Sequence, residues 1–226
     1  MDFNDVDDFP SHYQVKKLIT ELTGIEPIIC DCCINTCIGY TGPFSQLDHC
    51  PTCGEARYDQ EKLLETGGKV KVPRKRFPTI CLGPQLQAMY RDPEKARDMH
   101  YRRERTQEIF NELDDNEGIK QAYNDFLDGS DYLEAVADGR IKDEDIVVMF
   151  SIDGAQLYRN KESDCWMSIW IIFERSPDSR YKKKYVLPGV IIPGPNKPKN
   201  LDSFLFPGFH HLAAIQKEGL PIWDAS

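Results

Sequence analysis

The sequence predicts an α+β protein in which an N-terminal helix and a four-cysteine cluster come first, a helical middle region follows, and three strands and a helix come last. Two observations predict this order. Apolar residues recur at helical spacing before residue 146, whereas runs rich in β-branched and aromatic residues begin only there. Six of the eight cysteines lie between residues 30 and 53. With 226 residues, 40% of them hydrophobic, the chain has enough apolar surface for a folded core.

The first element expected is an amphipathic helix within an N-terminal segment, residues 1–29. Ser11 and Gln14 match the capping-box pattern, and Gly24 ends the run. Between them, four apolar residues recur at helical spacing: Val15, Leu18, Ile19 and Leu22. The acidic start MDFNDVDDF is unlike a signal peptide, and no run approaches the roughly 18 apolar residues of a membrane span. The sequence therefore predicts an intracellular protein with no membrane partner.

The cysteine cluster, within residues 30–66, has the ligand spacing of a zinc knuckle. Cys33-x3-Cys37 and Cys50-x2-Cys53 are two short pairs separated by a loop. A short pair places two thiolates on one turn, and Zn²⁺ takes four such ligands in a tetrahedron. Two short pairs within so few residues favour zinc over free buried cysteines. A closed site of four thiolates would be structural, because it leaves no position for catalytic water. Three neighbouring residues remain as alternative ligands: Cys30, Cys32 and His49.

Residues 67–145 are expected to hold a basic linker and then helices. Gly67 and Gly68 precede a stretch of five basic residues, which include Arg74, Lys75 and Arg76. Such a stretch is typical either of a nuclear-import or phosphate-contacting segment or of a plain solvated linker. The net charge of −9 argues against a general nucleic-acid coat protein, which is usually strongly basic.

Two helices are expected in this middle region. Asp92 and Pro93 supply an N-cap and a first-turn proline for a long helix that runs to about Leu113. Ser130 caps a shorter helix that ends near Gly139. The twelve carboxylates between residues 112 and 145, against three basic residues, indicate a solvated face.

Residues 146–226 are expected to form three strands, at 146–152, 167–173 and 185–192, and then a helix that Asp202 caps and that runs to about Glu218. Three strands and one helix do not cover both faces of a sheet, so more strands are expected beyond residue 226. Asp153 lies at the end of the first strand, where a carboxylate can hold a divalent metal. On spacing alone, a turn-forming Asp-Gly is the commoner interpretation.

Several long phrases, in order, resemble the CACTA-type (En/Spm-like) transposases of fungal genomes. The phrases are CCINTCIGYTGPFSQLDHCPTCGEARY, FPTICLGPQLQAMYR, YRRERTQEI, GSDYLEAVADGRI, FSIDGAQLYRNKESDCW, YVLPGVIIPGPNKPKNLDSFLFPGFHHL and GLPIWDA. The resemblance implies a nuclear cut-and-paste DNA transposase with a ribonuclease H-like fold, of which residues 146–226 are the first part. It also implies an Asp-Asp-Glu/Asp site with two Mg²⁺ ions, whose first acid carries over onto Asp153.

The phrases that would carry the second and third acids are not matched in this chain. The resemblance therefore implies an N-terminal fragment that does not cleave DNA by itself. Phosphate contacts are expected from Lys182, Lys183 and Lys184, and from the loop at 159–161, although a solvated hairpin tip explains the three lysines equally well. The alternative function is a zinc-dependent module that binds DNA or a protein without catalysis. Self-association is a further expectation.

Overall fold

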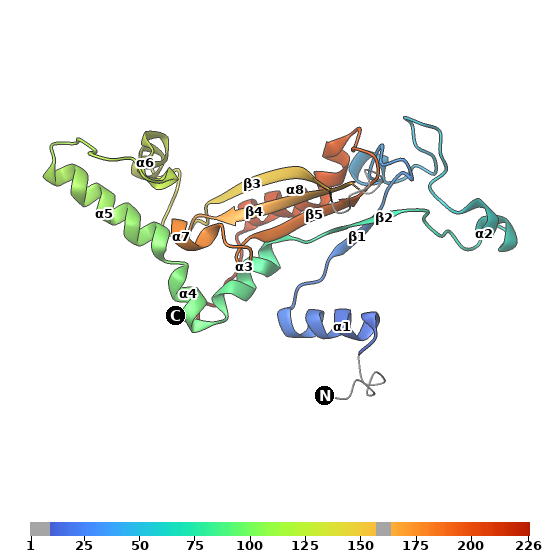
Figure 1. Cartoon of the computed structure of the whole chain (residues 1–226), viewed down its shortest axis with the longest axis horizontal. Helices are drawn as coiled ribbons and strands as arrows, with labels where there is room; N and C mark the ends of the chain where they lie inside the picture. Colours follow the sequence, from blue (N-terminus) through green and yellow to red (C-terminus); the bar gives the residue numbers. More distant parts are fainter. Residues whose placement is uncertain (1–9, 157–163) are drawn as a thin grey trace.

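The computed structural model describes residues 10–156 and 164–226, and its centre is a five-stranded antiparallel sheet with the strand order β1-β2-β5-β4-β3 (Figure 1). The strands are β1 (Ile28–Asp31), β2 (Arg76–Thr79), β3 (Val148–Gln156), β4 (Asp164–Ile172) and β5 (Leu187–Pro193). The three strands expected after residue 146 are confirmed. The other two strands, β1 and β2, were not predicted, and β2 extends the sheet by pairing with β5 through Thr79 and Val190.

Eight α-helices and two short 3₁₀ turns complete the described chain. The helices are α1 (His12–Thr23), α2 (Gln60–Glu65), α3 (Leu82–Tyr90), α4 (Pro93–Asp98), α5 (Tyr101–Asp115), α6 (Ser130–Ala137), α7 (Pro177–Arg180) and α8 (Leu201–Glu218), and the turns are η2 (Gly42–Phe44) and η3 (Phe126–Asp128). The predicted capping box is confirmed, because the side chains of Ser11 and Gln14 each accept from the other residue's backbone N–H. Gly24 ends α1 in the left-handed conformation, as expected.

Three details of the predicted helices are wrong. The long helix expected from 93 to 113 is two helices, α4 and α5, because the chain bends at Met99 to bury this side chain beside Trp170. Ser130 is the first residue of α6 rather than its cap. Asp202 lies in the first turn of α8, whose cap is Asn200, since the Asn200 side chain accepts from the Ser203 N–H.

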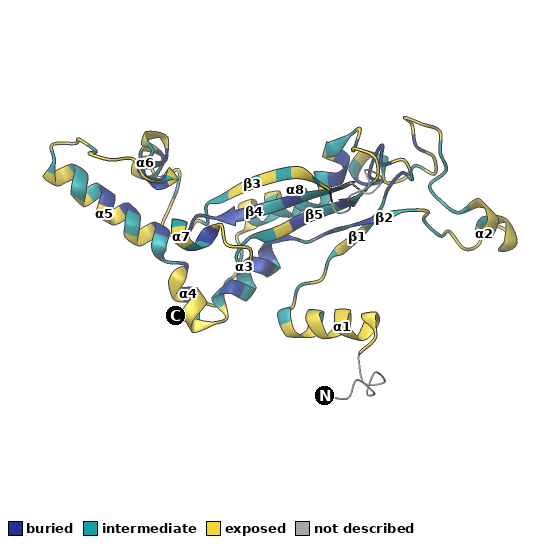
Figure 2. Ribbon diagram, in the orientation of Figure 1, coloured by how far each residue is buried: buried dark blue, intermediate teal, exposed yellow. Residues whose placement is uncertain are grey.

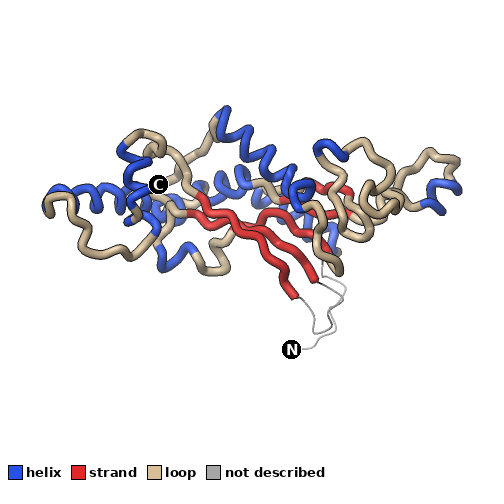
Figure 3. The backbone as a smooth tube through the Cα atoms, turned by 90° about the horizontal axis from the view of Figure 1, so that it is seen from above, coloured by secondary structure: helices blue, strands red, loops and turns tan. Residues whose placement is uncertain are grey.

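The core lies on the face of the sheet that α3 and α8 cover. One cluster joins Leu82 and Leu86 of α3 to Trp170 and Ile172 of β4. Seen from above, the strands form one layer with helices to one side of it (Figure 3), and the buried residues follow the sheet and α3 (Figure 2). α1 is exposed along its length (Figure 2).

A second core cluster joins segments that the sequence analysis treats separately. It contains Cys32 from the cysteine region, Phe77 from β2, Ile192 from β5 and Phe204 from α8, and the rings of Phe77 and Phe204 meet edge to face at 5.0 Å. The segment expected to be a linker, residues 67–76, is joined to the rest of the structure. Pro73 forms an isolated bridge with Tyr58, and Arg76 is the first residue of β2. One core therefore contains residues from all three segments that the boundaries at 66 and 145 separate.

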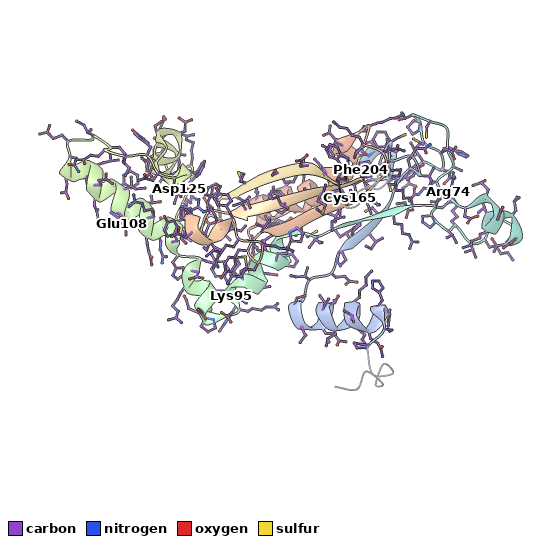
Figure 4. All side chains as sticks on the ribbon, in the orientation of Figure 1. Arg74, Lys95, Glu108, Asp125, Cys165 and Phe204 are labelled. Carbon is purple, nitrogen blue, oxygen red and sulfur yellow. The ribbon has the colours of Figure 1, made fainter. Side chains whose placement is uncertain are left out.

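The helical arm formed by α5, η3 and α6 joins the sheet through buried ion pairs. Arg102 of α5 donates to Glu174 at 2.7 Å, and both side chains are almost fully buried. Arg180 pairs with Asp125 at 3.0 Å, where the arm meets α7 (Figure 4). The acidic stretch expected to be a solvated face is only partly so, because Asp128 is buried and contacts Lys120.

Candidate metal centre

The four cysteines predicted as ligands come together at one point. The Sγ atoms of Cys33, Cys37, Cys50 and Cys53 all lie within 4.8 Å of one another, and those of Cys33 and Cys53 are 3.5 Å apart. In a tetrahedral site with Zn–S bonds of about 2.3 Å, neighbouring sulfurs are about 3.8 Å apart. The spacing and the four-thiol donor set therefore suit a single tetrahedral metal ion.

Each cysteine pair is held by a tight turn. In the first turn, Cys33 donates its N–H to Ile38 O at 2.9 Å and accepts at its own carbonyl from Thr36 at 2.8 Å. Thr36 has a φ of 59°, which is uncommon for a β-branched residue. In the second turn, Gly54 has a φ of 75° and donates to Cys50 O at 2.8 Å, so a glycine is needed there.

The thiols ionise unequally. Cys33, Cys37 and Cys50 are buried, and burial raises the pKa of Cys37 to about 12. Burial also opposes ionisation of Cys53, but the N–H of Glu55 and the hydrogen bonds from the neighbouring thiols outweigh it and lower the pKa of Cys53 to about 7. A divalent cation is the partner that allows all four to ionise together, since thiolates are the metal-binding form.

The alternative ligands lie outside this group in the part of the chain that the structure describes. Cys32 is packed into the core with Phe77 and Phe204, and burial raises its pKa to about 12. Cys30 is a residue of β1, and His49 forms a bridge with Ala56.

Asp153 is not at a strand end, which corrects the expectation from the sequence. It lies inside β3, opposite Met167, and the strand continues to Gln156. The pairing continues because Gly154 lets the Trp166 ring pack closely; a Cβ at Gly154 would lie 3.2 Å from that ring. Asp153 is exposed, and its Oδ1 accepts from the Gly154 N–H at 2.7 Å.

The described residues do not provide a magnesium site at Asp153. The cysteine tetrad is the one group of three or more His, Cys, Asp or Glu ligand atoms that converges within residues 10–156 and 164–226. Two Mg²⁺ ions need several carboxylates from different elements. Asp153 alone does not fit them.

The basic residues predicted to contact nucleic acid fall into two groups. Lys75 points into the protein, where its Nζ donates to Thr36 Oγ1 at 2.6 Å and to Gly194 O at 2.8 Å. Arg74, which lies toward the end of the molecule that carries α2 (Figure 4), pairs with Glu55, and Arg76 pairs with Asp31 at 3.6 Å. Arg74 and Arg76 are exposed but paired with these carboxylates, whereas Lys182, Lys183 and Lys184 are exposed on the segment that follows α7. The loop with Arg159, Asn160 and Lys161 lies outside the described residues.

Arg57 is a residue of the centre that the sequence analysis missed. Its guanidinium donates to Asp31 Oδ2 at 2.7 and 2.9 Å and to Ser45 O at 2.8 Å. It also lies over the Tyr40 ring, 4.8 Å from the centroid. Arg57 thus ties the second cysteine pair to β1, and only its position between the second pair and the basic stretch could have drawn attention to it.

Comparisons with family models, curated proteins and solved structures give no match. Within the described residues, no helix is long and apolar enough to cross a membrane. The structure itself shows a mixed α+β fold around a five-stranded antiparallel sheet and a cluster of four cysteines able to hold a metal ion.

Proposed function

We propose that this chain is part of a cut-and-paste DNA transposase in which the four cysteines hold a structural zinc ion. The observation that supports it is the order β3-β4-β5, an antiparallel meander followed by α8 on one face, with Asp153 on the first strand. This is the order expected for the first part of a ribonuclease H-like fold from the resemblance in sequence. DNA in the nucleus is the partner that follows from this proposal.

The role of the zinc ion would be structural. The closed set of four sulfurs leaves no position for a substrate, so the metal supplies crosslinking between the two turns. The knuckle, residues 30–66, is bonded to the start of α8: Gly39 N donates to Ser203 Oγ at 2.8 Å, and Asn200 N donates to Cys37 O at 2.9 Å. A bound ion therefore fixes the helix that crosses the sheet bearing Asp153.

In this proposal Asp153 is the first metal-binding acid. It binds the catalytic ions only together with further acids that the described residues do not supply. Its exposure on β3 leaves it accessible to such partners. The chain by itself is expected not to cleave or join DNA with Mg²⁺ or Mn²⁺, because one carboxylate binds these ions weakly.

A second candidate function is a zinc-stabilised module that binds DNA or protein without catalysis. Among the described residues, Asp153 belongs to no group of three or more converging ligand side chains, which favours this function. The exposed lysines 182–184 favour a sequence-independent contact with phosphates. This contact should be weak, because the chain carries a net charge of −9.

An excision assay in the longer parent protein separates the two functions. Asp153→Asn should abolish excision and leave the zinc content at one ion per chain. Asp178→Asn, a change at an exposed acid of α7, is the matched control and should retain full activity. Full excision by the Asp153 variant would show that another residue is the first catalytic acid, whereas a wild-type parent that does not excise would leave the binding module as the function.

A further inference from the structure

α1 carries an apolar stripe that the rest of the described chain does not cover. Leu18, Ile19 and Leu22 lie on one face, and Leu22 is 72% exposed. No residue of α1 is buried. The helix is held at its C-terminal end, where Arg91 donates to Thr23 O at 3.3 Å, and it is exposed along its length in Figure 2.

Such a helix requires a partner surface. Isolated helices shorter than about 12–15 residues are marginal in water, even with good helix formers, because nucleation is costly. α1 has 12 residues, and its capping box and glycine C-cap define where it starts and stops. Caps contribute about 1 kcal/mol, so most of the stability of a helix like α1 must come from packing of its apolar face.

An apolar groove of about 450 Å³ lies between β1, the knuckle and α8. Its lining includes Ile28 of β1, Tyr40 of the knuckle, and Phe206 and His210 of α8. Phe206 is 41% exposed, and its ring rests against the bare backbone of Gly42. None of the described residues of α1 lines this groove. The molecule therefore presents both an unpaired apolar helix and an unfilled apolar groove.

We propose that the occupant of this groove is α1 of a second copy of the chain, in a two-fold dimer in which each copy gives its helix and receives that of the other. A two-fold interface is self-complementary, so one arrangement covers both surfaces on both copies. Residues 24–27 link α1 directly to β1, and Ile28 of β1 lines the groove. The helix that would be exchanged therefore begins next to the groove that would receive it.

The apolar area is a large part of what a stable dimer needs. The exposed large side chains on the apolar stripe of α1 and in the groove are Val15, Leu18, Ile19, Leu22, Ile28 and Phe206, which are 38–72% exposed. Six large side chains that are about half exposed offer on the order of 500 Å² per chain, compared with the roughly 800 Å² per partner of a standard interface.

Sedimentation velocity of the full chain with zinc, from about 1 to 100 μM, tests the proposal, and the wild type should sediment with twice the mass of one chain. Leu18→Asp with Leu22→Asp should weaken dimerisation by at least about 100-fold, because the two leucines that the dimer would bury are replaced by charged side chains. Lys16→Asp with Thr20→Asp adds the same two carboxylates to the other face of α1 and should leave the dimer intact. Zinc content should be unchanged in both variants, and circular dichroism should change only in the Leu18/Leu22 variant, by the helical signal of α1.

A mixing experiment tests the groove. Phe206→Asp alone should also give monomers, and the Phe206 and Leu18/Leu22 variants mixed together should form a heterodimer, because one intact helix and one intact groove remain. A monomeric wild type at 100 μM overturns the proposal, and so does a monomer whose α1 amides are protected from hydrogen exchange. Failure of the two variants to pair would place the dimer contact elsewhere. These outcomes are independent of zinc-site chemistry and of transposition.

Discussion

Replacing Lys75 by methionine tests whether this residue is an internal clamp or a surface contact for DNA. The substitution keeps a flexible apolar side chain and removes the ammonium group. In the structure that group donates to Thr36 Oγ1 at 2.6 Å, to Gly194 O at 2.8 Å and to Ile34 O at 3.4 Å. It joins the first cysteine turn to the loop between β5 and α8. Burial lowers the pKa of Lys75, so the partners must offset a desolvation cost.

The expected loss is about 2–4 kcal/mol of unfolding free energy. Hydrogen bonds from a charged donor contribute about 1.5–3 kcal/mol each, and the relief of desolvation offsets part of the two short ones. Lys182→Met is the matched control, because Lys182 is exposed and a surface change of this kind costs at most about 0.5 kcal/mol. Chemical denaturation in excess zinc measures both variants. Equal midpoints for the two variants and the wild type would refute the clamp.

Four further outcomes are expected. Cys50→Ser should reduce bound zinc well below one ion per chain, measured by elemental analysis, with hydrogen exchange rising at the start of α8 as well as in the knuckle. Gly83→Ala should cost about 1–3 kcal/mol in chemical denaturation, because a Cβ there would lie 2.9 Å from His211 Nε2. Burial lowers the pKa of His211, so the unfolded chain binds the proton more readily and stability should fall as the pH drops below about 6.5 toward the lower folded pKa; denaturation of His211→Gln should lack this component. Glu174→Gln should cost about 3–5 kcal/mol at pH 7 by thermal or chemical unfolding, because Arg102 loses its buried partner.

Local patterns predicted the elements whose signals are local. The capping box and Gly24 fixed both ends of α1, and the β-branched runs located three strands. The ligand spacing predicted the four cysteines that meet. In each case neighbouring residues in the sequence determine the geometry.

The two missed strands have no such local signal. β1 is only four residues long, Ile28–Asp31, and β2 contains Pro78, which usually argues against a strand. They exist because they pair with one another and because Thr79 pairs with Val190 of β5, far away in sequence. Likewise, Asp153-Gly154 was interpreted as a possible turn, because the packing of Trp166 on the glycine is invisible in the sequence.

The sequence also does not show which basic residues are accessible to DNA, for a related reason. Lys75 and Lys182 both belong to basic stretches, and composition gives no means of telling them apart. The turn around Thr36 and the loop at Gly194 supply the acceptors that draw Lys75 inward, whereas Lys182 remains on the surface. A basic run in sequence therefore states a charge and leaves open whether that charge is available to a partner.

The four cysteines and the sheet are joined by a shared core, which bears on what a bound metal would do for this chain. A separate knuckle would unfold alone when its metal is removed. Here Cys32 lies in the core with Phe204, and Cys37 O accepts from Asn200 N at the start of α8. Structural zinc contributes about 10–16 kcal/mol in zinc-finger peptides, comparable to the 5–15 kcal/mol stability of a whole domain. If the cysteines hold zinc as proposed, these contacts connect the site to α8, and the metal would stabilise the packing of α8 on the sheet that carries Asp153, although the two lie in different parts of the sequence.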